Sequence, residues 1–209
     1  MRNMSTIVGL IVVAVLALAL YNMTYAAQSP SAPPLSLVQK GDTGNISSHV
    51  ARPSSFPRTT SSIVGPPTIT ADFIDRVLRD AHSPAVGIGN AMYRLGMQYG
   101  IDPAFPLAFF HHESTYGKAG WAVTNHSIGN IRCTAGYACN GGYRFYSTWE
   151  AGVADWYLLI STVYLPQGLN TIEKIIPVYA PSADNNNEAA YIGSVLSDMA
   201  AFRRGEVYA

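Results

Sequence analysis

One glutamate in the chain is a candidate acid catalyst. Glu113 ends a strongly apolar run that includes Phe109 and Phe110, and the polar segment 114–117 follows it. A carboxyl group held against aromatic surface is costly to ionise, so it tends to keep its proton near neutral pH. Such a group can protonate a leaving oxygen as a general acid. The alternative is a structural glutamate, exposed on its helix or paired with His111 or His112.

The sequence does not identify a partner carboxylate for Glu113. No Asp or Glu occurs between residues 114 and 149. Glu150 fits the third helical position of a capping box that begins at Ser147, and Asp155 fits an ordinary solvated charge. Asp184 and Glu188 flank the asparagine run 185–187. We expect one residue of this group, the two acids and the three asparagines, to cap the last helix.

Neither a catalytic metal nor a serine triad is favoured. His111, His112 and Glu113 are contiguous, so their side chains splay around a helix instead of converging on one ion. The HExxH spacing of zinc hydrolases does not occur, and neither does the G-x-S-x-G turn of serine hydrolases. We therefore expect no metal and no cofactor.

The composition argues against nucleic-acid binding. The 13 basic and 13 acidic residues balance, and no basic run or patch appears. The chain has 13 tyrosines, whose flat amphipathic rings suit stacking on sugars. For any single tyrosine, a place in the core or on the surface is the more ordinary role.

The N-terminus has the pattern of a targeting segment, residues 1–27. Its apolar centre, residues 7–20, has the length of a signal peptide and is short for a membrane span. Small residues at 24 and 26 suit a cleavage site. An uncleaved membrane anchor is the alternative, because residues 4–27 carry no charge. Either way, we expect the rest of the chain to be exported, as a secreted or envelope-anchored extracytoplasmic protein.

Export makes the two cysteines interpretable. Cys133 and Cys139 enclose a short, turn-prone segment, and in an oxidising compartment they are expected to form one local disulfide. A zinc site is the alternative, although no second cysteine pair supports it.

Residues 28–67 resemble a linker, and residues 68–205 a folded domain. The linker is rich in proline and serine and lacks apolar periodicity, so we expect it to be extended or disordered. In the domain, cap and periodicity signals predict six helices. The first three cover about 71–81, 83–100 and 103–115, and the other three begin near 147, 170 and 188. The Gly-, Asn- and Tyr-rich segment 118–146 predicts a loop and a small hairpin. The expected class is α+β and mainly helical.

Four segments in order carry a resemblance to a known family. They are Ala108-Phe-Phe-His-His-Glu113-Ser-Thr-Tyr-Gly117-Lys118, Asn125-His-Ser-Ile-Gly-Asn-Ile-Arg132, Tyr143-Arg-Phe-Tyr146 with the helix after it, and Tyr179-Ala-Pro followed by Tyr191. Over residues 70–204 the domain resembles the lysozyme-like superfamily. It is most similar to the bacterial glucosaminidases related to mannosyl-glycoprotein endo-β-N-acetylglucosaminidase. The resemblance implies a lysozyme-like domain with a small β-hairpin insert.

The resemblance also implies roles for single residues. Glu113 would be the general acid, and Tyr179 or Tyr191 would stabilise the reaction centre or orient an acetamido group. The residues implied to line the substrate cleft are Tyr116, Trp121, Asn125 and Asn130. The chain departs from the family where Asn130 replaces the usual glycine and where a second glutamate is missing from the β region. Water activated by a carboxylate elsewhere, or attack by the substrate's own acetamido oxygen, could replace that glutamate.

The expected function is that of a peptidoglycan hydrolase, a glycosidase cutting β-1,4 bonds of the glycan strand as an endo-β-N-acetylglucosaminidase. The expected partner is the peptidoglycan strand, and we expect a monomer. A lytic transglycosylase or muramidase acting on the same polymer is one alternative. A non-catalytic cell-wall-binding module is another, because the second carboxylate is missing.

Overall fold

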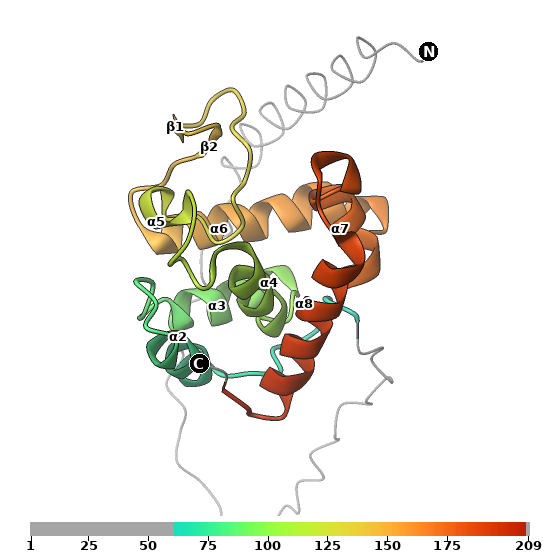
Figure 1. The fold of residues 1–209 in the computed structure, drawn as a ribbon. Helices are drawn as coiled ribbons and strands as arrows, with labels where there is room; N and C mark the ends of the chain where they lie inside the picture. The colour runs from blue at the N-terminus through green and yellow to red at the C-terminus, as the bar shows by residue number, and fades with distance from the viewer. Residues whose placement is uncertain (1–60, 208–209) are drawn as a thin grey trace, which may run out of the picture. The chain divides into compact units, whose positions relative to one another are not determined.

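The computed structural model of the chain describes residues 61–207. The predicted targeting segment and residues 28–60 of the predicted linker lie outside the described residues. The described part contains seven α-helices and one two-stranded antiparallel sheet (Figure 1), which confirms the mainly helical α+β class. In this part of the chain, no helix combines the length and apolar character needed to cross a membrane.

Helix α4 (Ala104–Ser114) runs through the middle of the domain (Figure 1). Its residues 104–110 are all buried, because a helix with apolar side chains on every face is stable only inside a core. It packs against α8 (Glu188–Arg203). Glu113 therefore lies at the C-terminal end of α4, where the helix leaves the core.

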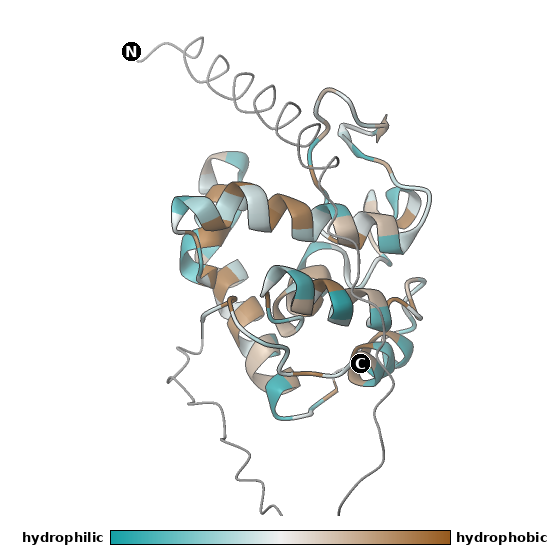
Figure 2. Cartoon of the chain, turned by 180° about the vertical axis from the view of Figure 1, so that it is seen from behind, coloured by the Kyte–Doolittle hydropathy of each residue, from teal (hydrophilic) through white to brown (hydrophobic). Residues whose placement is uncertain are grey.

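The remaining helices surround α4. Helix α2 (Ala71–Asp80) packs on α3 (Gly89–Tyr99), α3 packs on α6 (Trp149–Leu159), and α7 (Ile172–Tyr179) packs on α8; α5 (Ala122–Asn125) is a single turn. Most helices carry both hydrophobic and hydrophilic residues (Figure 2). Helix α2, for example, turns Phe73, Ile74, Val77 and Leu78 into the core, so its apolar stripe faces inward.

Helix α6 continues into a wider and then a tighter turn. The π-helix η1 (Ile160–Tyr164) follows it directly, and the 3-10 helix η2 (Leu165–Gln167) ends the element. A π turn displaces the residues after it, and such turns are frequent at functional sites. Here the change places the ring of Tyr164 5.8 Å from that of Tyr179 on α7.

The predicted hairpin and disulfide are both present. Strand β1 (Cys139–Asn140) pairs antiparallel with β2 (Tyr143–Arg144), and Cys139 lies opposite Arg144. The disulfide joins Cys139 to Cys133. The hairpin is therefore tied to the strand-like segment that precedes it.

Residues 61–67, which we predicted to be linker, are part of the folded domain. Ile63 is fully buried in the core. Its neighbours Ser62 and Val64 form isolated antiparallel bridges with Thr171 and Ile101. A single apolar residue among serines and prolines leaves no periodic signal, and its partners lie far along the chain, so the linker prediction extended too far.

Two predicted helix starts are also displaced. Helix α3 begins at Gly89 and not at Ser83, whose hydroxyl instead donates to the Tyr116 carbonyl (2.7 Å). Asp75 of α2 accepts from the amides of Gly87 (2.9 Å) and Gly89 (3.0 Å), so the start of α3 is set by another helix.

Helix α6 begins one residue later than a capping box at Ser147 predicts. Its N-cap is Thr148, whose hydroxyl accepts from the Ala151 amide at 3.2 Å. Glu150 is consequently the second helical residue. At α8, Asn187 accepts from Ala190, so the asparagine run does supply the expected cap.

Candidate active site

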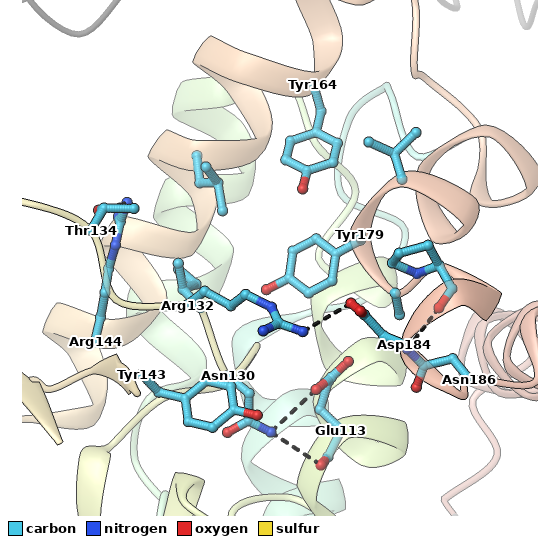
Figure 3. Close-up of a pocket in the computed structure, with 15 residues that line it drawn as sticks. Glu113, Asn130, Arg132, Thr134, Tyr143, Arg144, Tyr164, Tyr179, Asp184 and Asn186 are labelled. Atoms are coloured by element: carbon cyan, nitrogen blue, oxygen red, sulfur yellow. Dashed lines mark hydrogen bonds and ion pairs between the residues drawn. The ribbon is translucent and has the colours of Figure 1, made fainter. Parts of the chain in front are cut away.

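A cavity of about 420 Å³ opens where α4 ends. The loop after α5, the hairpin, the end of α6 and the α7–α8 connection enclose it (Figure 3). Its polar and charged lining residues are Glu113, Asn130, Arg132, Thr134, Tyr143, Arg144, Tyr164, Tyr179, Asp184 and Asn186. Segments far apart in the sequence thus meet around the predicted acid.

The end of α4 is shaped so that Glu113 faces this cavity. The helix stops at Ser114, and Thr115, Tyr116 and Gly117 all have positive φ angles. A side chain at Gly117 would collide with the rings of Trp149 and Phe110. Glycine is therefore required where the chain turns sharply away from the helix.

The Glu113 carboxyl is half-buried and held by two donors. The Tyr191 hydroxyl donates to Oε1 at 2.5 Å, and Asn130 Nδ2 donates to Oε2 at 3.2 Å and to the Glu113 carbonyl at 3.4 Å. Burial raises the pKa of Glu113, and the hydrogen bonds from Tyr191 and Asn130 offset part of that rise. The net effect is a raised pKa, so the carboxyl keeps its proton to a higher pH than an ordinary glutamate does.

The neighbouring histidines do not pair with Glu113. His111 Nδ1 lies 2.7 Å from Asp198 Oδ2 on α8, and the His112 ring stacks on Tyr191 with 3.6 Å between centroids. Burial and the nearby His111 lower the pKa of His112. The alternative role of Glu113 as the partner of a histidine is therefore not what the structure shows.

Tyr191 acts on Glu113 from behind the cavity wall. Its ring is buried on α8 between Phe109 and His112, and it is not among the residues that line the cavity. Burial raises the pKa of the Tyr191 phenol well above its usual value, so the hydroxyl remains a donor. Tyr191 thus positions the carboxyl, whereas the resemblance implied direct action on the reaction centre.

Tyr179 does line the cavity, but its hydroxyl already has a partner. It donates to the Gly129 carbonyl at 2.5 Å, and its ring packs edge-on against Phe109 at 4.8 Å. A Cβ atom at Gly129 would collide with Trp156 and with that hydroxyl. The close packing of these two residues fixes the main chain just before Asn130.

Asn130 has a backbone conformation that glycine adopts more readily than other residues do. Its φ angle is 45°, in the left-handed region, which asparagine tolerates better than most residues. This conformation turns its amide toward Glu113, while its buried Oδ1 has no hydrogen-bond partner among the described residues. Asparagine thus meets the backbone requirement and adds a donor to the acid.

Three of the residues predicted to line the cleft lie elsewhere. Tyr116 is buried under α4, where its ring stacks on His111 at 4.5 Å. Asn125 is buried and bonds both the carbonyl and the side chain of Asn140 at 3.0 Å, which anchors the hairpin. Trp121 is exposed and lies against Gly141 at the hairpin turn.

Local contacts explain two of these differences. The resemblance assigned these side chains to the cleft, but the left-handed turn after α4 directs Tyr116 back into the core. The hairpin then needs an internal anchor, which Asn125 provides. Of the seven residues predicted for the site, the cavity region brings together Glu113, Asn130, Tyr179 and Tyr191.

A charged pair that the sequence did not reveal crosses the cavity. Arg132 and Asp184 meet from opposite sides (Figure 3), with 2.9 Å between Nη2 and Oδ2. Asp184 belongs to the short 3-10 helix η3 (Ser182–Asp184). It provides a second carboxylate in the lining, 71 positions from Glu113 in the sequence, and no local pattern predicts that meeting.

A second arginine in the lining is firmly engaged. Arg144 bonds Asp155 Oδ2 at 2.7 Å and Thr134 Oγ1 at 2.8 Å, and its guanidinium lies 3.6 Å from the Tyr137 ring centroid. Asp155, expected to be a solvated charge, is 12% exposed and also accepts from Tyr146. Arg144 therefore holds the hairpin to α6.

Residues 61–207 contain no cluster of three or more His, Cys, Asp or Glu side chains placed to hold a metal ion. Comparison with known proteins yields no match either to a protein-family model or to a curated protein. The function of the cavity is consequently inferred from its own residues.

Proposed function

We propose that this protein hydrolyses glycosidic bonds in the glycan strand of peptidoglycan, with Glu113 as the general acid. The observation that carries the proposal is a carboxyl with a raised pKa at the wall of a cavity of about 420 Å³. Glycoside hydrolysis needs such a protonated carboxyl beside the leaving oxygen. The proposal includes a lysozyme-like fold and an extracytoplasmic location, which rest on the resemblance and on the N-terminal segment.

The donors around Glu113 suit the step in which it loses its proton. In that step the proton passes to the glycosidic oxygen, the bond from that oxygen to the anomeric carbon breaks, and positive charge develops on the sugar. The Glu113 carboxylate left behind accepts hydrogen bonds from Tyr191 and Asn130. Because hydrogen bonds to an ionised acceptor are stronger than those to a neutral one, these donors favour the transition state over the ground state.

Two groups could complete the reaction. Asp184 lines the same cavity and supplies the carboxylate that could activate a water molecule. Alternatively, the acetamido oxygen of the sugar attacks the anomeric carbon, and water then opens that intermediate. The aromatic rings of Tyr143, Tyr164 and Tyr179 in the lining offer surfaces on which sugar rings can stack.

The decisive experiment is mass spectrometry of the fragments that the full chain releases from purified peptidoglycan. Reducing N-acetylglucosamine ends are expected from the unaltered protein and not from Glu113→Gln. Glu173→Gln is the matched control, because Glu173 is exposed on α7; it should cut normally.

Other products would change the assignment in defined ways. Reducing N-acetylmuramic acid ends would indicate a muramidase, and anhydro ends a lytic transglycosylase. Binding to the wall polymer without any fragments, from a protein shown to be folded, would overturn the enzymatic proposal in favour of a wall-binding module.

A further inference from the structure

Arg132 has an unused hydrogen-bonding face within the cavity. Its side chain is 73% exposed, and its guanidinium makes one hydrogen bond within the described residues, from Nη2 to Asp184 Oδ2. A guanidinium has five N–H donors arranged as a fork that fits a carboxylate through two parallel bonds. Most of that fork is therefore available to a ligand.

The main chain beneath Arg132 is fixed on both sides. The Ile131 carbonyl accepts from the Arg144 amide at 2.8 Å, and the Cys133 amide donates to the Gly142 carbonyl at 2.9 Å. Arg132 itself forms an isolated bridge with Tyr143, and the disulfide anchors the next residue. An exposed side chain on such a rigid base can bind a ligand at little cost in backbone ordering.

Comparison with Arg144 shows that this availability is specific to Arg132. Both arginines line the cavity, but the Arg144 side chain is only 9% exposed and bonds both Asp155 and Thr134. A ligand that replaced Asp155 at Arg144 would break a buried ion pair, which is strongly unfavourable. An exposed pair such as Arg132–Asp184 is weak and exchanges readily.

The charges of the lining favour a negative ligand at this position. When Glu113 carries its proton, Asp184 is the remaining negative residue of the lining, and its contact with Arg132 is the one an incoming anion would replace. Planar bidentate recognition by arginine suits carboxylates. The geometry thus matches a sugar that carries a carboxylate substituent.

We propose that Arg132 is an anion subsite that binds a carboxylate of the glycan substrate in exchange for Asp184. This inference rests on the proposed function and specifies its substrate class, an acidic amino-sugar strand in preference to a neutral one. The exchange leaves the Asp184 carboxylate unpaired beside the bound sugar. In the muramic acid strand the carboxylate comes from the lactyl ether or from an attached peptide, and both sources present the same chemistry to Arg132.

The test is a calorimetric titration of the full chain carrying Glu113→Gln, so that the probes are not cut. The probes are N,N′-diacetylchitobiose, the N-acetylglucosamine–N-acetylmuramic acid disaccharide, and that disaccharide with a dipeptide on its lactyl group. Arg132→Gln should weaken binding of at least one carboxylated probe about tenfold, the loss expected for a charged hydrogen bond. Binding of chitobiose should not change.

Two further variants sharpen the result. Asp184→Asn should tighten binding of the same carboxylated probe, because it removes the competing carboxylate. Arg94→Gln, at an exposed arginine of α3 that does not line the cavity, should leave binding of all three probes unaltered. The carboxylated probe that responds more strongly to Arg132→Gln identifies the lactyl or the peptide carboxylate as the ligand.

The inference is overturned if Arg132→Gln weakens all three probes equally or none of them. This outcome is separable from failure of the proposed function, which the fragment analysis of the unaltered protein reports independently. If binding depends on Arg132 but no cleavage occurs, the subsite proposal stands and the enzymatic proposal fails. If cleavage occurs but binding does not depend on Arg132, the enzymatic proposal stands and the subsite proposal fails.

Discussion

The hydroxyl of Tyr191 on α8 donates a 2.5 Å hydrogen bond to Oε1 of Glu113 on α4. This bond links the two helices that pack together at the centre of the domain. Tyr191 is itself sandwiched between Phe109 and His112, so its hydroxyl has little freedom to turn away. The acid is thus held from within the core while its other side faces the cavity.

Removing this hydroxyl is expected to alter the pH dependence of activity. The hydrogen bond from Tyr191 lowers the pKa of Glu113, so Tyr191→Phe should raise that pKa further and move the basic limb of the pH–rate profile upward. The rate should fall roughly 10- to 100-fold, because the carboxylate formed in the reaction loses a charged hydrogen bond. Measuring kcat against pH checks both effects.

A matched substitution separates this effect from a general loss of structure. Tyr99→Phe removes a hydroxyl from α3, where the ring stacks on Tyr157 away from the cavity lining. It should leave the pH–rate profile unchanged. A profile for Tyr191→Phe that falls without moving along the pH axis would contradict the role given to the hydroxyl.

The raised pKa of Glu113 also predicts how stability depends on pH. The folded state holds the proton more tightly than the unfolded chain, whose carboxyl has an ordinary pKa of 4.5. The free energy of unfolding must therefore fall as the pH rises from that ordinary value through the raised folded-state pKa. Below the ordinary pKa both states are protonated and the penalty disappears.

Glu113→Gln should consequently stabilise the protein at neutral pH and not at acid pH. The expected gain is about 1 kcal/mol, typical of relieving a strained functional residue. Thermal unfolding followed by circular dichroism at a series of pH values measures it. The same series on Glu173→Gln should give a small difference that does not vary in this way, since that carboxyl is exposed. A gain that is equal at all pH values would point to packing instead of ionisation.

Much of this fold follows from local patterns, and the failures have identifiable causes. Thr70 and Asn187 each cap a helix by accepting a hydrogen bond from an amide three residues later. Such a cap can be predicted because it depends only on residues within one turn. Ser83 had an equally good cap signal, yet its hydroxyl is taken by the carbonyl of Tyr116, 33 positions away. Tertiary contacts of this kind cannot be read from a window of ten residues.

The candidate site shows the same division. The place of Glu113 beside apolar side chains could be predicted because those side chains belong to its own helix. Its role as an acid stays a prediction. Arg132 and Asp184 were missed as a pair because they are 52 positions apart and meet only through the fold. Tyr116 was misplaced because the left-handed turn after α4 reverses the direction in which its side chain points.

The two ion pairs near the cavity should differ sharply in their effect on stability. Asp155→Ala leaves Arg144 with its charge buried and uncompensated, since the paired side chains are 9% and 12% exposed. The expected loss is about 3 kcal/mol. Asp184→Ala breaks a pair whose side chains are 73% and 44% exposed, and it should cost less than about 0.5 kcal/mol.

Urea unfolding of the two alanine variants gives both values directly. The comparison is informative because each substitution removes the one carboxylate that pairs with an arginine of the cavity lining. Similar losses for both variants would mean that Asp184 is anchored more firmly than its exposure indicates, and that the proposed exchange at Arg132 is too costly to occur.

The segment that precedes α2 should contribute to the stability of the domain. Ile63 is fully buried, whereas the adjacent Val64 is 40% exposed, although both sit in the same short stretch bridged to Thr171 and Ile101. Ile63→Ala creates a cavity in the core and should cost about 3 kcal/mol. Val64→Ala, the matched control, should cost about 0.5 kcal/mol or less, as surface substitutions usually do.

The free energy of unfolding of the full chain with each substitution measures this difference. A large loss only for Ile63→Ala would place the start of the folded domain before residue 63, so that a protein beginning at residue 68 would lack part of its core. Equal, small losses for both variants would instead restore the boundary predicted from composition. We expect the first result because the Ile63 side chain is completely buried in the folded protein and exposed to water in the unfolded chain. Its burial therefore stabilises the folded state.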